Sequence, residues 1–379
     1  MIVKVLTLSL VILAGILVTA TRAGAQVTVP APSPQATPPA DSQEKIKVFT
    51  EEVVIPVTAY DDSGHLSFAL NPQDILVFED DVRQDVRSIR RIPANVLLLL
   101  DTGGALNPAM SVSVTKEIAT RLISSLKTDD RVAAIQFGNS VELIENWTTD
   151  RQHLIQAINT KLISGRHSRL IKALLAAAVQ LKEVPAGTRH IVLITDGVDS
   201  SGDSEALTEA IRQLLGANVT VHVIGYGALG RKKINKQNPL VIITNQKRKS
   251  AKDIADELLY PNRQEDYKKW KKIYLVVDTD FAMRKKRDDY KEATRQGELW
   301  LQSLAEETGG LAFIPRSTAE MTPRAEEIAR EIDSQYVVSY RPKRPLALAT
   351  EEEYRRIKVA PGVIGLHVRA RRGYVARVQ

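Results

Sequence analysis

Two uninterrupted apolar runs, each ending in an aspartate, constrain the fold of this chain more than any other feature. The first covers residues 96–101 and ends at Asp101, and the second covers residues 191–196 and ends at Asp196. An apolar run without polar alternation predicts a strand covered on both faces, as in a parallel sheet between helices. Ligands of open α/β sheets bind beyond the carboxyl ends of the strands. We therefore expect both carboxylates at one edge of one sheet, as a divalent-cation site or the remnant of one.

The region around these runs alternates between helical and strand patterns. Strands are predicted at 131–137, 219–224 and 311–314, with helices between them, and residues 141–144 are predicted as an antiparallel strand at the sheet edge. The segment 336–340 is predicted as the last strand of the same sheet. Alternating strands and helices are typical of βαβ crossovers. The predicted fold class is therefore α/β, with a doubly wound, mostly parallel sheet.

The rest of the chain divides into flanking segments. Residues 1–25 resemble a signal peptide, with a basic start, an apolar core and an Ala-Gly-Ala cleavage pattern; an uncleaved membrane anchor is the alternative. Residues 26–44 form a Pro-rich linker, and 45–92 are β-rich. The α/β domain is assigned to 93–342, with a basic insertion at 231–291, and a C-terminal β segment to 343–379.

The two β-rich flanks are expected to pair with each other. Three short strands in 45–92, at 53–60, 75–78 and 82–89, are marginal as an independent sheet. Two further strands are predicted at 354–359 and 366–371. Pairing between the two ends of the chain would build a small β sandwich beside the α/β domain.

Composition excludes several classes of protein. The chain has no cysteine, so it has no disulfide, no thiolate nucleophile and no cysteine-based zinc site. The formal net charge is +7, and much of the positive charge gathers in the insertion at 231–291. Because an exported protein meets little nucleic acid, the predicted partner is a protein or another cell-surface ligand. For the insertion, an anionic membrane surface and a charged face without any partner both stay open.

Several separated motifs resemble one known family. They lie at 74–80, 96–101, 168 with 173–174, 191–197, 221–225, 304–310, 335–342 and 372–376. Together these segments resemble the von Willebrand factor A-type domain, in particular an exported bacterial group with an N-terminal β segment. The resemblance covers most of the chain apart from the signal segment, the linker and the basic insertion. It implies a non-enzymatic interaction or adhesion module.

The resemblance also implies a degenerate metal site. The family uses Asp-x-Ser-x-Ser, a threonine on the next loop and an aspartate after a later strand. Asp101 and Asp196 match, and Ser168 stands where the threonine belongs, but Gly103 and Ala105 replace the two serines. Magnesium requires near-octahedral oxygen ligation. We expect no cofactor beyond weak magnesium binding, and favour a structural role in which both aspartates accept hydrogen bonds from helix N-terminal amides.

Two other motifs point to enzymes and are set aside. Residues 225–230 match G-x-G-x-x-G after a strand, but the following lysines and Pro239 predict no helix to complete a dinucleotide site. His167, Ser168 and Asp196 could form a triad, although adjacent His and Ser rarely converge as base and nucleophile. We therefore expect no enzyme.

The expected contact surface is the upper rim of the sheet. It comprises residues 102–107, 165–168 and 197–202 together with the basic insertion, and its candidate contacts are Thr102, Gly103, His167 and Asp199. The favoured function is a metal-independent interaction module. Magnesium-dependent adhesion through the residual site, and a scaffold that binds anionic surfaces through the insertion, are the alternatives.

Overall fold

The computed structural model describes residues 52–66, 69–104, 108–182, 184, 187–236, 241–243, 274–276, 281–346, 349 and 353–376. The chain divides into two units, residues 1–49 and residues 50–379. The predicted signal peptide and linker lie outside the described residues. No helix in the described part of the chain is long and apolar enough to cross a membrane.

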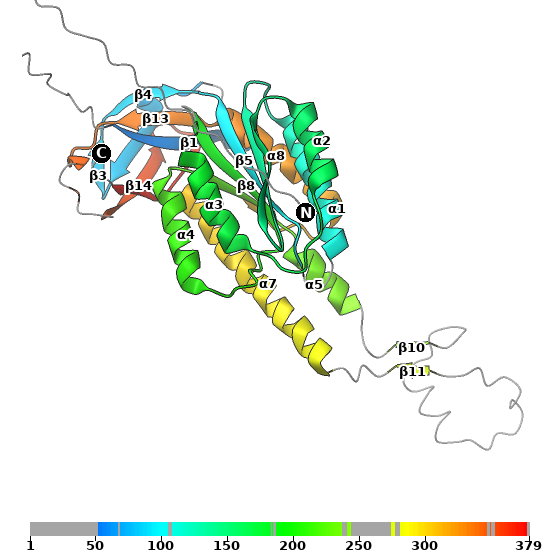
Figure 1. Cartoon of the computed structure of the whole chain (residues 1–379). Helices are drawn as coiled ribbons and strands as arrows, with labels where there is room; N and C mark the ends of the chain where they lie inside the picture. The colour runs from blue at the N-terminus through cyan, green and yellow to red at the C-terminus, as the bar shows by residue number, and fades with distance from the viewer. Residues whose placement is uncertain are drawn as a thin grey trace, which may run out of the picture. The chain divides into compact units, whose positions relative to one another are not determined.

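A six-stranded sheet forms the centre of the second unit (Figure 1), in the order β12-β9-β8-β5-β6-β7. Its strands are β5 (Ala94–Asp101), β6 (Arg131–Phe137), β7 (Val141–Thr148), β8 (Thr188–Thr195), β9 (Thr220–Gly225) and β12 (Ala312–Phe313). All neighbours pair in parallel except β7, which runs antiparallel to β6 at the edge. The predicted doubly wound, mostly parallel sheet is confirmed.

Helices cover both faces of this sheet, which explains the continuous apolar strands. One face packs against α1 (Pro108–Ser125), α2 (Arg151–Lys161) and α8 (Met321–Ser334). The other packs against α3 (Leu170–Lys182), α4 (Ser204–Gly216) and α7 (Phe281–Thr308) (Figure 1). Within β5, Leu98 and Leu100 enter the first core and Leu97 and Leu99 the second. Successive side chains of a strand point to opposite faces of the sheet. Because helices cover both faces, the side chains on each face of the strand are apolar.

The flanks build two further four-stranded sheets. One has the order β15-β1-β13-β4, and the other β16-β14-β2-β3. The strands are β1 (Val53–Asp61), β2 (Ile75–Glu79), β3 (Val82–Gln84), β4 (Val86–Arg90), β13 (Tyr336–Tyr340), β14 (Glu353–Pro361), β15 (Leu366–Ala370) and β16 (Gly373–Ala376). Because β1 pairs with β15 and β2 pairs with β14, the predicted association of the two ends of the chain is confirmed.

Two strand predictions in the flanks were wrong. Residues 336–340 do not join the central sheet: β13 lies between β1 and β4 in the sandwich. All five of its residues are buried, and a fully buried run does not reveal which sheet it belongs to. The single strand predicted at 82–89 is two strands, β3 and β4, which belong to different sheets.

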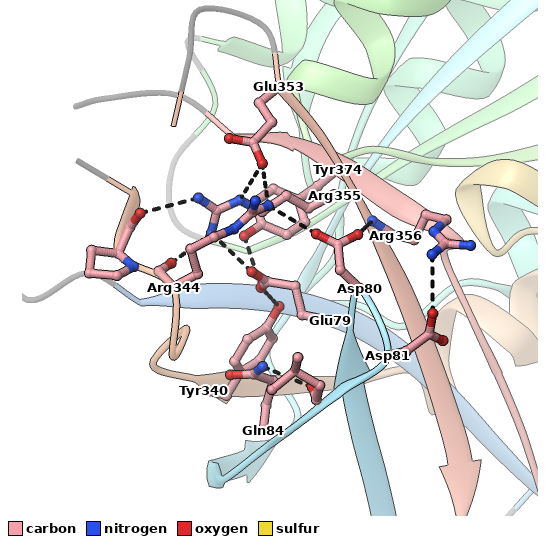
Figure 2. A network of polar contacts seen from close by, with 12 residues as sticks. Glu79, Asp80, Asp81, Gln84, Tyr340, Arg344, Glu353, Arg355, Arg356 and Tyr374 are labelled. Carbon is pink, nitrogen blue, oxygen red and sulfur yellow. Dashed lines mark hydrogen bonds and ion pairs between the residues drawn. The ribbon is translucent and has the colours of Figure 1, made fainter. Parts of the chain in front are cut away.

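The sandwich encloses a buried ion pair (Figure 2). The Arg355 guanidinium is fully buried and donates to Glu79 Oε1 at 2.9 Å and to the Arg344 carbonyl oxygen at 2.7 Å. The other Glu79 oxygen accepts the hydroxyl of Tyr340 at 2.6 Å and that of Tyr374 at 3.1 Å. Burial and hydrogen bonding to Glu79 raise the pKa of the Tyr340 hydroxyl, which therefore stays protonated as a donor. Each charge thus has partners inside the core, as burial requires.

One arginine ties the sandwich to the α/β body. Arg371 is 3% exposed; its guanidinium donates to the Leu215 carbonyl oxygen at 2.9 Å and to the Asn218 side chain. Asn218, at a positive φ of 57°, donates in turn to the carbonyl oxygen of Val54 in β1 at 3.1 Å. Burial lowers the pKa of Arg371 to about 10, so its charge persists at neutral pH. Hydrogen bonds of Arg371 and Asn218 therefore connect the sandwich to the α/β body.

The basic insertion begins and ends in helices. The segment after β9 forms α5 (Gly227–Lys236), and α7 already begins at Phe281. The insertion was predicted to extend to residue 291, so its last part is in fact the first three turns of a long helix. Between them the structure describes two short strands, β10 (Val241–Ile243) and β11 (Tyr274–Val276), which pair antiparallel.

Candidate functional site

The two candidate carboxylates lie at the same edge of the central sheet. Asp101 is the last residue of β5, and Asp196 directly follows β8, which pairs with β5 in parallel. Asp101 is 0% exposed and Asp196 is 4% exposed. Burial, followed by the nearby Asp196 charge, raises the pKa of Asp101 well above its usual value. The strand pattern therefore placed the two groups correctly relative to each other.

Groups of the same chain occupy both oxygens of Asp101. Oδ2 accepts the Thr195 hydroxyl at 2.6 Å and the Ser168 hydroxyl at 3.3 Å. Oδ1 accepts the backbone N–H of Gly103 at 2.9 Å. The Thr115 hydroxyl donates to the Asp101 carbonyl oxygen at 3.0 Å. Asp101 therefore fixes the start of the following loop and connects it to β8 and to the loop before α3.

Asp196 is held by a residue that sequence reasoning missed. Its Oδ1 accepts the N–H of Val198 at 3.0 Å, and its Oδ2 accepts the hydroxyl of Tyr290, on α7, at 2.8 Å. Burial raises the pKa of Asp196, and burial and the Asp196 charge raise the pKa of Tyr290, which keeps its proton. Because 94 residues separate the two partners in the sequence, no local sequence pattern predicts this contact.

The backbone around the carboxylates is packed too closely for larger side chains. A Cβ on Gly103 would overlap the carbonyl oxygen of His167, and one on Gly297 would overlap the carbonyl oxygen of Gly197. Gly197 itself has a φ of +83°, which an L side chain adopts with strain. The loop after β5 therefore lies directly against residues 167–168, and α7 lies directly against the loop after β8.

This donor set does not fit a magnesium ion. Position 103 offers no side-chain oxygen and no room for one, and Ala105 lies outside the described residues. The hydroxyl of Ser168, which the resemblance places as a ligand, is already donated to Asp101. The described residues contain no group of three or more His, Cys, Asp or Glu side chains arranged to hold a metal. The arrangement acts as a polar latch that connects β5, β8, the loop before α3 and α7.

The structure changes the list of rim contacts. Thr102 is 1% exposed and Gly103 is buried, so neither residue is accessible to a partner in this conformation. Their inclusion was wrong because the loop before α3 covers them. His167 is exposed. Asp199 is partly exposed, and its carboxylate accepts the N–H of Ile171 at 2.9 Å and the N–H of Ser201 at 2.6 Å, which orders two neighbouring loops.

The enzyme-like motifs have structural explanations. Ser168 donates its hydroxyl to Asp101, and no bond joins it to His167 among the described residues. A helix, α5, does form here and begins at Gly227, within the G-x-G-x-x-G segment, so the expectation of no helix was wrong. Its glycines instead permit close packing, since a Cβ on Gly227 would meet the Asp196 carbonyl oxygen and one on Gly230 would meet the Tyr290 hydroxyl.

Comparison with known proteins gives one family match. Residues 95–259 match the family model of the von Willebrand factor type A domain. An uncharacterized protein of Synechocystis sp. is 27% identical over 143 residues, which cover 36% of this chain. The chain spans only 33% of the length of that relative.

Solved structures match this chain with low sequence identity and low TM-scores. An aerotolerance-related membrane protein from Bacteroides fragilis is 17% identical, covering 63% of this chain and 98% of that chain, with a TM-score of 0.37. A von Willebrand factor type A protein from Catenulispora acidiphila is 11% identical, covering 86% of this chain and 74% of that chain, with a TM-score of 0.42. Neither likeness bears on ligand or activity.

Proposed function

We propose a function that starts from the match of residues 95–259 to the von Willebrand factor type A domain. The proposed function is that of an exported, non-enzymatic interaction module that binds its partner without a bridging metal ion. The single observation that supports this most strongly is that groups of the same chain already bond to the side-chain oxygens of Asp101 and Asp196.

A metal ion would have to displace the bonds that hold this edge together. The oxygens of Asp101 and Asp196 accept hydrogen bonds from the hydroxyls of Thr195, Ser168 and Tyr290, with donor–acceptor distances between 2.6 and 3.3 Å. Breaking them would leave buried hydroxyls unpaired, at about 1–3 kcal/mol each. Weak coordination of a metal ion would not compensate for the loss of these hydrogen bonds. The carboxylates instead order the loops that carry the contact surface.

The contact surface lies on the loops above the latch. Residues 166–167, 169 and 200–205 are exposed. The N–H groups of Arg166 and His167 donate to Asn139 Oδ1, and the N–H of Ser200 donates to the carbonyl oxygen of the buried Ser168, which orders this part of the surface. Binding residues are commonly found on loops that a rigid scaffold positions. An interaction module needs such a surface and no reactive group, which is what this edge offers.

Calorimetry tests the metal independence directly. The full chain and its Asp196→Ala variant would be titrated with magnesium and with manganese. We expect no binding heat beyond dilution for either protein. Micromolar binding by the parent chain that Asp196→Ala abolishes would overturn metal independence and favour magnesium-dependent adhesion instead.

The interaction itself is tested by cross-linking in cells that express the full chain. We expect cross-linked products to form equally with and without a metal chelator. Their loss on chelation would contradict the proposal. N-terminal sequencing of the mature protein tests export, with Gln26 as the expected first residue; a chain that retains Met1 would contradict cleavage at this site.

A second candidate function rests on the exposed start of α7. Arg284, Lys285, Lys286 and Arg287 lie together on the first two turns of this helix, the first three with exposed side chains, and the helix extends away from the central sheet (Figure 1). Such a cluster favours an anionic membrane surface, and its attraction would be screened by salt. Co-sedimentation with phosphatidylglycerol vesicles would fall with added salt and with Lys285→Glu/Lys286→Glu. Binding that neither change reduces would exclude this role.

A further inference from the structure

The loop before α3 carries a row of exposed cations. Residues 163–172, here called the cationic loop, comprise that loop and the first turn of α3. They include Arg166, Arg169 and Lys172 with exposed side chains, and His167 lies between the two arginines. None of these three permanently charged side chains forms a hydrogen bond or ion pair with any other described residue. An unpaired group of like charges on a fixed loop calls for a partner of opposite charge.

The backbone of this loop is held at nearly every step. The N–H of Gly165 donates to the Thr102 carbonyl oxygen at 2.8 Å. The N–H groups of Arg166 and His167 donate to Asn139 Oδ1 at 2.9 and 3.2 Å, and that of Ser168 donates to Ser200 Oγ at 2.9 Å. The loop is therefore ordered before any partner arrives, which lowers the entropic cost of binding.

Acidic side chains on neighbouring elements form no ion pair with the arginines and lysine of the cationic loop. Asp199, on the adjacent loop, uses one oxygen for the N–H of Ile171 and the other for Ser201. Asp203 caps α4 through a bond from the N–H of Ala206 at 2.9 Å. Glu142, beyond β6, accepts bonds from Gln136 and Ser140. Each of these carboxylates therefore accepts hydrogen bonds from neutral groups, and none forms an ion pair with Arg166, Arg169 or Lys172 among the described residues.

We propose that the cationic loop binds an acidic segment of a partner protein. This inference rests on the proposed interaction function and names the chemistry of its partner. Arg166 and Arg169 each offer the planar fork of donors that matches a carboxylate. They flank His167 on one short stretch of loop. Carboxylates spaced along an extended peptide suit such a row.

One further observation favours a peptide over an anionic surface. Ile163, three residues before Arg166, is 63% exposed on the same loop. An apolar side chain beside the cations matches a segment that alternates acidic and apolar residues. The row is also short, whereas binding to a lipid surface typically uses clusters of four to eight basic side chains.

The test compares two charge-reversed variants of the full chain. Arg166→Glu/Arg169→Glu changes the cationic loop. Arg83→Glu/Lys358→Glu makes the same charge change on the sandwich, where both side chains are exposed and unpaired among the described residues. All four side chains point to solvent, so unchanged thermal unfolding confirms that each variant folds. The probe is a fluorescent peptide of alternating glutamate and leucine, measured by anisotropy at low salt.

We expect the parent chain and the sandwich variant to bind this peptide with similar affinity. The cationic-loop variant should bind the peptide more weakly, by roughly tenfold for each of the two arginine–carboxylate ion pairs that it loses. Equal binding by all three proteins would overturn the proposal. Phosphatidylglycerol vesicles or inorganic phosphate that compete better than an unlabelled copy of the peptide would also overturn it, because the partner would then be a phosphate group.

Failure here can be told apart from failure of the proposed function. If cellular cross-linking persists with a chelator and in Arg166→Glu/Arg169→Glu, the module still binds a partner and only the acidic chemistry is wrong. If cross-linking is lost on chelation while the peptide still binds the parent chain, metal independence is wrong and the cationic loop stands.

Discussion

Removing one hydroxyl from the latch gives a quantitative test of its role. Tyr290→Phe deletes the donor that lies 2.8 Å from Oδ2 of Asp196 and leaves the ring in place. Asp196 is 4% exposed, so water cannot readily replace the lost bond. A hydrogen bond to a charged group contributes about 1.5–3 kcal/mol. We therefore expect the free energy of unfolding to fall by about 2 kcal/mol near neutral pH.

The same variant should show a defined pH dependence. Burial raises the folded-state pKa of Asp196, so its contribution to stability is complete below the unfolded pKa and is lost as pH rises through the folded pKa. The Tyr290 hydroxyl opposes that shift because it favours the carboxylate. Without it the folded pKa rises further. The deficit of the variant should therefore be larger at about pH 8 than at about pH 4.5.

Urea unfolding of the full chain at both pH values measures the deficit. Tyr354→Phe is the matched control, because its hydroxyl lies 3.4 Å from Glu307 at an exposed site and should contribute little. Superimposable curves for the parent chain and Tyr290→Phe at the higher pH would refute the reasoning. A deficit that is the same at both pH values would show that Asp196 is not the group responsible.

Three further changes probe other parts of the fold. Gly103→Ser should lower the free energy of unfolding by about 2 kcal/mol or more without creating magnesium binding in calorimetry, because its Cβ would overlap the backbone of His167; a stable variant that binds the ion would contradict this. Arg355→Ala should cost about 3–5 kcal/mol in urea unfolding because it leaves Glu79 charged in the core, and a cost below that of an exposed arginine would show that the ion pair is dispensable. Burial and the nearby Asp130 raise the pKa of Asp333 to about 6, so its contribution to stability is present at low pH and is lost as pH rises to about 6. Asp333→Asn should remove this fall in stability, which is about 1 kcal/mol at most for this half-exposed group; a pH profile that is unchanged between about pH 4 and pH 6 would exclude the role of Asp333.

The sequence predicts the parts of this fold that depend on local patterns. The apolar run that ends at Asp101 indicated a strand buried on both faces, and its repeat before Asp196 indicated a neighbour in the same sheet. The β-rich ends indicated a shared sandwich, which β1 and β15 form. In each case the local pattern of apolar residues along the chain predicts the strands.

The sequence could not predict contacts made between distant segments. The lysines after Gly230 suggested a loop, yet α5 forms there because it packs against α7. The bond from Tyr290 to Asp196 depends on where a long helix crosses the sheet edge. The burial of Thr102 depends on the loop before α3 lying over it. None of these is a property of neighbouring residues in the chain.

The short connection between α8 and β13 has a mechanical consequence. Only Gln335 separates the end of the helix at Ser334 from the strand that starts at Tyr336. That strand is bonded along one side to β1 and along the other to β4. Sliding α8 along its own axis would therefore shear two ladders at once. Motion caused by a partner at the opposite edge must be taken up by loops or by α7, and tension applied to the sandwich would reach the α/β body through this helix.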